Sequence, residues 1–69
     1  MSFKLTDAGE DQATNPSRKP GLESKAIAFM YMVGKPIELE EIMDEVRLSD
    51  EKTVELITRM KNEGFVEEV

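Results

Sequence analysis

Apolar residues recur at helical spacing in three segments, which predicts helices over residues 22–33, 38–46 and 50–62. Each predicted helix has one apolar face for the core. The first face consists of Leu22, Ala26, Ile27, Phe29, Met30, Tyr31 and Val33. The second consists of Leu39, Ile42, Met43 and Val46. The third consists of Thr53, Val54, Leu56, Ile57 and Met60.

The ends of the predicted helices carry residues typical of caps. Ser49 precedes the third helix, and Asp50 and Glu51 follow it, which matches a side-chain N-cap with acidic residues in the first turn. Gly34 and Gly64 follow the first and third helices, where glycine accepts a left-handed conformation. Only about three residues separate the second and third helices, a length typical of a helix–turn–helix.

Two short segments alternate apolar and polar residues, which predicts strands over residues 3–6 and 65–69. Residues 36–38 are either a very short strand or an extended connector. Residues 7–21 are rich in turn-forming residues and predict a linker, which carries the basic pair Arg18 and Lys19. We therefore divide the chain into an N-terminal strand and linker, residues 1–21, and a domain, residues 22–69.

Composition excludes several classes of chemistry. The chain has 69 residues, no cysteine and no histidine. It therefore lacks disulfides, thiolate chemistry, the commonest metal ligand and the commonest general base. The acidic clusters of residues 38–45 lack the loop spacing of a calcium site. We expect no enzyme activity, no metal and no cofactor.

Charge and hydropathy bear on the partners and the compartment. The formal net charge is −6 and the pI is about 4.5, which favours solubility and repels phosphate and anionic lipid. The longest apolar run, residues 26–33, is far shorter than the ~20 residues that span a bilayer. No signal peptide is visible. We expect a cytoplasmic protein without a membrane partner.

Three motifs resemble the winged helix-turn-helix family. They are Thr53-x3-Ile57-x2-Met60-x3-Gly64-Phe65-Val66, Gly34-Lys35-Pro36-Ile37-x4-Glu41-Ile42 and Leu5-Thr6-Asp7-Ala8-Gly9. The resemblance implies a mainly helical fold of three helices with a small β-sheet, and a DNA-binding role in transcription regulation. The family normally has two strands joined by a wing loop after the glycine, whereas one strand remains here. We hypothesise that residues 3–6 supply the missing strand, antiparallel to residues 65–69.

The resemblance implies that the third helix contacts double-stranded DNA. The candidate contact residues are Arg47, Ser49, Lys52, Thr53, Arg59 and Lys61. The acidic residues Asp50, Glu51 and Glu55 in the same helix repel phosphate and leave an alternative open. In that alternative the chain is an acidic protein–protein interaction module for a basic partner, and Tyr31 and Met32, if both exposed, form part of an apolar contact patch. A homodimer would suit either function.

Overall fold

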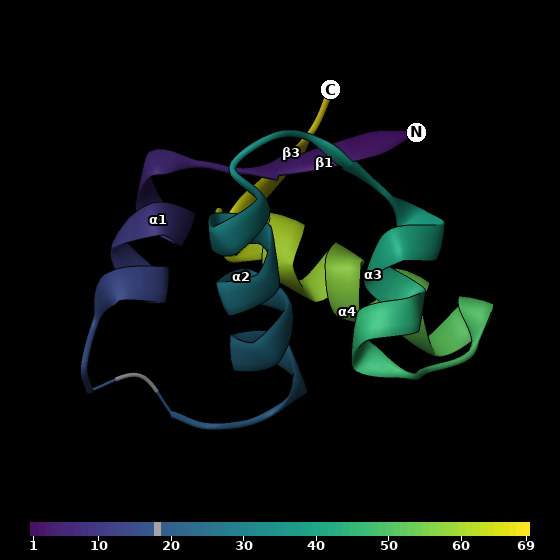
Figure 1. The fold of residues 1–69 in the computed structure, drawn as a ribbon, viewed down its shortest axis with the longest axis horizontal. Helices are drawn as coiled ribbons and strands as arrows, with labels where there is room; N and C mark the ends of the chain where they lie inside the picture. The colour runs from purple at the N-terminus through teal and green to yellow at the C-terminus, as the bar shows by residue number, and fades with distance from the viewer. Residues whose placement is uncertain (18) are drawn as a thin grey trace.

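The computed structural model describes residues 1–17 and 19–69, so Arg18 of the predicted basic pair lies outside the described residues. Over the described part of the chain, four helices and three strands are present. They are β1 (Ser2–Leu5), α1 (Asp7–Thr14), α2 (Leu22–Val33), β2 (Ile37–Glu38), α3 (Leu39–Val46), α4 (Asp50–Asn62) and β3 (Val66–Glu68) (Figure 1). The predicted mainly helical fold with a small sheet is confirmed.

The three helices predicted from apolar spacing are confirmed with nearly the same bounds. α2 covers residues 22–33 and is followed by Gly34 in the left-handed conformation, with a φ of 71°. α3 begins one residue later than predicted. α4 begins after its N-cap Ser49, whose hydroxyl accepts a hydrogen bond from the backbone N–H of Lys52 at 3.3 Å. Periodic apolar residues and local caps together are sufficient to define these helices.

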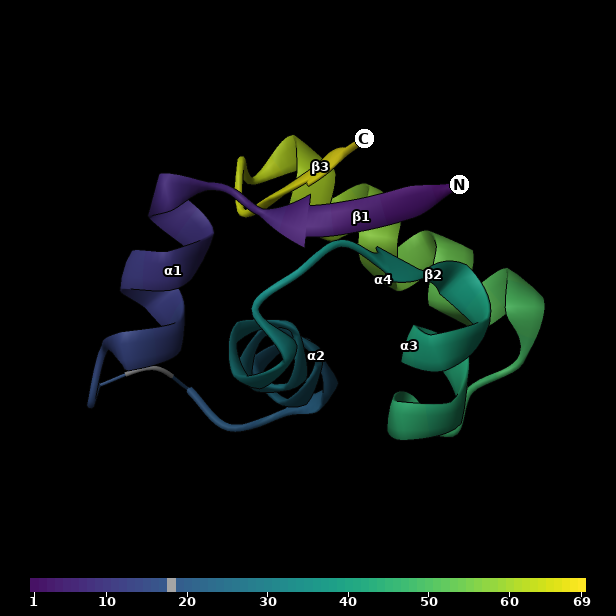
Figure 2. The same cartoon turned by 45° about the horizontal axis from the view of Figure 1, so that its top comes forward.

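The sheet has β1 in its centre, and both β2 and β3 pair with it in antiparallel orientation (Figure 2). Phe3 lies opposite Ile37 of β2 on one side and Glu68 of β3 on the other. Beyond β3, the backbone N–H of Val69 donates to the Ser2 carbonyl at 2.9 Å. The hypothesis that the N-terminal strand pairs with the C-terminal strand is therefore confirmed, and residues 36–38 contain a strand.

Residues 7–14 form helix α1, so the prediction of a linker over residues 7–21 is wrong for the first half of that segment. The apolar signal of α1 is weak because the helix buries only two small residues, Gly9 and Ala13. Glycine disfavours a helix interior by about 1 kcal/mol relative to alanine. Here it is required by packing, because a Cβ on Gly9 would lie 2.0 Å from the carbonyl oxygen of Phe65.

The core lies between the sheet and the helices, and α2 packs against α1, α3 and β1. Three residues predicted to face it are exposed instead: Leu22 by 45%, Tyr31 by 48% and Val54 by 47%. Leu22 is the first residue of α2. Tyr31 and Val54 each lie about 100° around their helix from the centre of the buried stripe. The predicted apolar faces of the first and third predicted helices were therefore wider than the faces that the structure buries.

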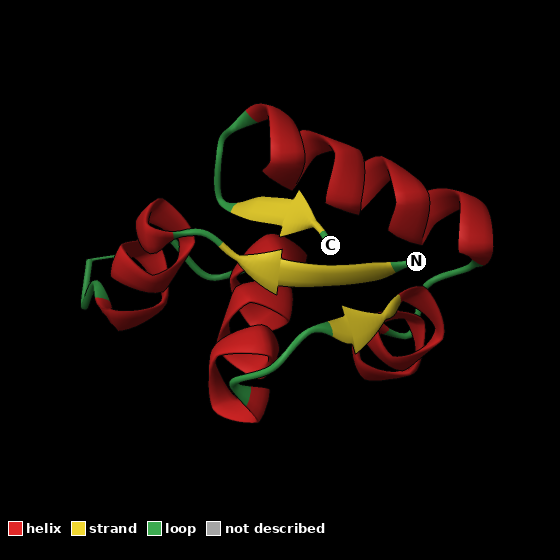
Figure 3. Ribbon diagram, turned by 90° about the horizontal axis from the view of Figure 1, so that it is seen from above, coloured by secondary structure: helices red, strands yellow, loops and turns green. Residues whose placement is uncertain are grey.

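All four described helices lie on one side of the sheet, and Figure 3 shows the opposite face of the strands with no helix in front of it. Lys4 and Glu67 lie opposite each other in the register of β1 and β3, and Lys4 Nζ is 3.6 Å from Glu67 Oε1. Both side chains alternate with the buried Phe3 and Val66, so they lie on the uncovered face. The face of the sheet that no helix covers therefore carries paired charged side chains in place of apolar ones.

Candidate functional site

The connection between α3 and α4 gathers three of the six predicted DNA-contact residues. Arg47 is the C-cap residue of α3, Ser49 is the N-cap residue of α4, and Lys52 lies in the first turn of α4. All three are exposed. The turn therefore presents two cations at the N-terminus of α4, where Asp50 and Glu51 offset part of their charge.

Arg47 has an unusual backbone conformation. Its φ of 58° and ψ of 45° place it in the left-handed region, and it is the one non-glycine residue with positive φ among the described residues. A side chain in this region costs about 1 kcal/mol or more relative to glycine. Glycine would adopt the backbone conformation of this turn at lower cost than arginine. The conformation therefore gives no reason for an arginine at position 47. The side chain of Arg47 is therefore a candidate for function.

The other three predicted contact residues are either buried or lie further along α4. Thr53 is 0% exposed, so its side chain does not reach a contact surface, which corrects its selection. Thr53 belongs to the buried stripe of α4, so its side chain faces the core although it lies near the N-terminus of the predicted DNA-contacting helix. Lys61 lies on the flank of α4 toward β3, with its Nζ 3.5 Å from Glu68 Oε1. Arg59 is exposed and lines a cavity together with Lys52.

This cavity, of about 840 Å³, lies between α4, the start of α2 and the connection from α1 to α2. Its described lining combines apolar residues such as Leu48, Leu56 and Phe65 with six charged residues. The charged residues are Lys19, Glu23, Lys52, Glu55, Arg59 and Glu63. Among the described residues, cations and carboxyl groups are equal in number around the cavity, and their net charge depends on which carboxyl groups are ionised.

Two of these carboxyl groups meet across the cavity. Glu23 lies in the first turn of α2, and Glu63 is the C-cap residue of α4. Burial, together with a hydrogen bond to Glu63 and the charge of Glu63, raises the pKa of Glu23 to about 7, although Arg59 opposes the increase. Neighbouring carboxyl groups share a proton more readily than they both ionise. Sequence reasoning missed this pair because α2 and α4 bring together residues that have no local motif in common.

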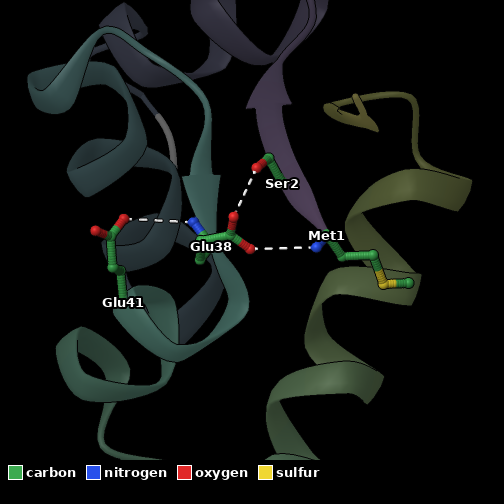
Figure 4. A network of polar contacts seen from close by, with 4 residues as sticks. All are labelled: Met1, Ser2, Glu38 and Glu41. Atoms are coloured by element: carbon green, nitrogen blue, oxygen red, sulfur yellow. Dashed lines mark hydrogen bonds and ion pairs between the residues drawn. The ribbon is translucent and has the colours of Figure 1, made fainter.

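Glu38 joins β1, β2 and α3 through polar contacts (Figure 4). Its carboxylate accepts a hydrogen bond from the Ser2 hydroxyl at 3.1 Å and lies 3.2 Å from the terminal ammonium of Met1. Its backbone N–H donates to Glu41 Oε2 at 3.3 Å. The hydrogen bonds from the terminal ammonium and from Ser2 lower the pKa of Glu38. This network joins β1 to the start of α3.

A small apolar surface is present on α2. Tyr31 is 48% exposed and Met32 is 84% exposed. The condition set for an apolar contact patch, exposure of both residues, is therefore met. These two exposed side chains fit a protein contact better than a nucleic-acid contact.

The described residues contain no group of three or more acidic, histidine or cysteine side chains placed to hold a metal ion. None of the helices in this part of the chain is long and apolar enough to cross a membrane. Comparisons with known protein families, with curated proteins and with solved structures find no match for this chain. A functional assignment therefore depends on the geometry of the surface.

Proposed function

We propose that the chain is a winged-helix domain that binds double-stranded DNA through α4 and the α3–α4 connection, in a transcription-regulatory role. Arg47 carries this proposal, because it is an exposed arginine in a left-handed conformation that glycine would adopt at lower cost. A guanidinium can bind a phosphate group through two parallel hydrogen bonds. Lys52 adds a second exposed cation within the same turn.

The order of the elements supports the same proposal. α3, a three-residue connection, α4 and β3 follow one another, and β1 lies beside β3 where the family has the second strand of its wing. α4 buries Leu56, Ile57 and Met60 and leaves its other side in solvent. A helix that enters the major groove needs such a free side.

The acidic residues of α4 set limits on this binding. Asp50, Glu51 and Glu55 are exposed on the same helix and repel phosphate. We therefore expect weak, salt-sensitive binding in which Arg47, Lys52 and Arg59 supply the phosphate contacts. A carboxylate on this face can also accept a hydrogen bond from cytosine, which would make the acidic residues a source of sequence preference.

Titration of a labelled DNA duplex at several salt concentrations tests the proposal. With three phosphate contacts, the slope of log K against log salt is expected to be about −2 to −3. Arg47→Gln should reduce this slope by about 1. Lys35→Gln is the matched control, because it removes the same charge from the α2–β2 connection, which lies away from the α3–α4 connection (Figure 1). Equal losses in both variants, or no duplex binding at low salt, would contradict the proposal.

A second candidate function is an acidic protein-interaction module. The exposure of Tyr31 and Met32 favours it, and the net charge of −6 favours a basic partner. A basic peptide added at low salt should then shift the amide signals of these two residues, while a duplex should shift none. Amide shifts confined to residues 47–62 on addition of a duplex would instead exclude this second candidate.

A further inference from the structure

We propose that the carboxyl pair Glu23–Glu63 makes the DNA contact of α4 pH-dependent, by competing with phosphate for the guanidinium of Arg59. When the two carboxyl groups share a proton, Arg59 is available to phosphate. When both are ionised, they hold Arg59 against the cavity. This regulation rests on the proposed DNA binding and acts at the same site.

The geometry around Arg59 supports this competition. Glu63 follows Arg59 by four residues in α4, a spacing at which oppositely charged side chains commonly pair. Glu63 is instead hydrogen-bonded to Glu23 of α2, and all three side chains line the same cavity. The ion pairs between described residues join Met1 to Glu38, Lys4 to Glu67 and Lys61 to Glu68, so none of them includes Arg59. Arg59 thus makes none of these ion pairs, while its positive charge still acts on Glu23 and opposes the increase in the pKa of that group.

Among the described residues, the charged groups at the cavity come from two segments besides α2. They are Lys19 in the connection before α2, and Lys52, Glu55, Arg59 and Glu63 in α4. The sequence contains no histidine and no cysteine, the side chains that ordinarily titrate between about pH 6 and 8.5. Burial and the neighbouring Glu63 raise the pKa of Glu23 to about 7, which places its charge change inside this range.

Loss of the shared proton has two effects on a nearby phosphate. It adds one negative charge at the flank of α4, which repels the DNA backbone. It also breaks the hydrogen bond between the carboxyl groups, so that two carboxylates attract the guanidinium of Arg59. Both effects weaken DNA binding as the pH rises through about 7, the pKa of Glu23.

The test is duplex affinity and its salt dependence at about pH 6 and about pH 8, with the complete chain. Wild type should bind several-fold more tightly at the lower pH, with a salt slope steeper by about 1, because one phosphate contact is gained. Glu23→Gln cannot ionise and can still donate a hydrogen bond to Glu63, so it should bind with the same slope at both pH values. Glu55→Gln is the matched control, because it removes one carboxylate from the same cavity and should keep the pH dependence.

The outcomes separate this regulation from the DNA binding itself. If wild type binds the duplex equally at both pH values, or if Glu23→Gln shows the same pH dependence as wild type, the regulation is overturned and the DNA binding stands. If no duplex binding is measured at either pH, both are overturned. Loss of the pH dependence in Glu23→Gln and its retention in Glu55→Gln would support the carboxyl pair as the cause.

Discussion

Thr6 holds three segments together at one point. Its backbone N–H donates to the Phe65 carbonyl at 3.0 Å, and its hydroxyl donates to the carbonyl of Gly64. The same hydroxyl accepts a hydrogen bond from the N–H of Gly9 at 3.1 Å, which makes Thr6 the N-cap of α1. One short side chain thus connects the end of β1, the start of α1 and the turn before β3.

Thr53 offers the opposite case, a polar group that stabilises nothing. Its side chain is fully buried, and its hydroxyl is the buried side-chain group without a hydrogen-bond partner among the described residues. Thr53→Val keeps the shape and removes the unpaired group, so it should stabilise the protein by about 1 kcal/mol. Urea unfolding at constant pH measures the change.

Thr53→Ser serves as the control for this substitution. It keeps the hydroxyl and removes a buried methyl group, so it should destabilise the protein by about 1 kcal/mol through lost packing. A Thr53→Val protein less stable than wild type would mean that the hydroxyl does have a partner in solution. The two variants together separate the polar cost from the packing of the same position.

At the residue scale, local chemistry was predictable and tertiary chemistry was not. The cap at Ser49 and the left-handed Gly34 follow from neighbouring residues, and both were predicted correctly. The pairing of Glu23 with Glu63 depends on how the fold brings the start of α2 near the end of α4, which no local pattern encodes. The left-handed conformation of Arg47 was equally hidden, because most arginines avoid it.

At the element scale, α1 is held by a close approach of its backbone to the segment before β3. Gly9→Ala would place a methyl group 2.0 Å from the Phe65 carbonyl oxygen, so α1 must move away from it. We expect the free energy of unfolding to fall by about 2 kcal/mol or more. We also expect the amides of α1 to exchange faster in the variant than in wild type. Urea unfolding and hydrogen exchange measure both effects.

The sign of this effect makes the prediction specific. At an unconstrained helix position, replacing glycine with alanine stabilises by about 1 kcal/mol. Ala8→Gly, on the exposed side of the same helix, controls for propensity and should cost about that much without any clash. If Gly9→Ala proves more stable than wild type, α1 does not dock as described.

Elements with a continuous apolar stripe were predictable, and α1 was not. α3 and α4 bury several large side chains, so their periodicity is visible in the sequence. α1 buries only a glycine and an alanine, and its other residues are polar except for the exposed Ala8. Its stability depends on the cap from Thr6 and on contact with α2, neither of which produces a periodic pattern.

At the scale of the whole molecule, two carboxyl groups give stability a maximum in mild acid. The pKa of Glu23 is raised from 4.5 to about 7, so its stabilising contribution is complete below 4.5 and is lost as the pH rises to about 7. The pKa of Glu38 is lowered, so its contribution is present above 4.5 and is lost as the pH falls through the lowered pKa. We expect unfolding midpoints in urea to be highest near about pH 5 and to fall toward neutrality.

Two variants test the basic side of this profile. Glu23→Gln should flatten the decline between about pH 5 and pH 8, because the group that loses its proton on unfolding is gone. Glu55→Gln, with its carboxylate on the same cavity, should retain the decline. A decline of equal size in the Glu23→Gln protein would assign the effect to other groups.

The central place of β1 in the sheet also sets an order of events during synthesis. A ribosome makes β1 before either strand that pairs with it, and β3 emerges only after α4. Until then the edge of β1 that pairs with β3 remains unpaired, even after β2 has been made, and it can pair with another nascent chain. Stable folding must therefore wait until residues 66–68 have left the exit tunnel, and translation that stalls within α4 should release an aggregation-prone intermediate.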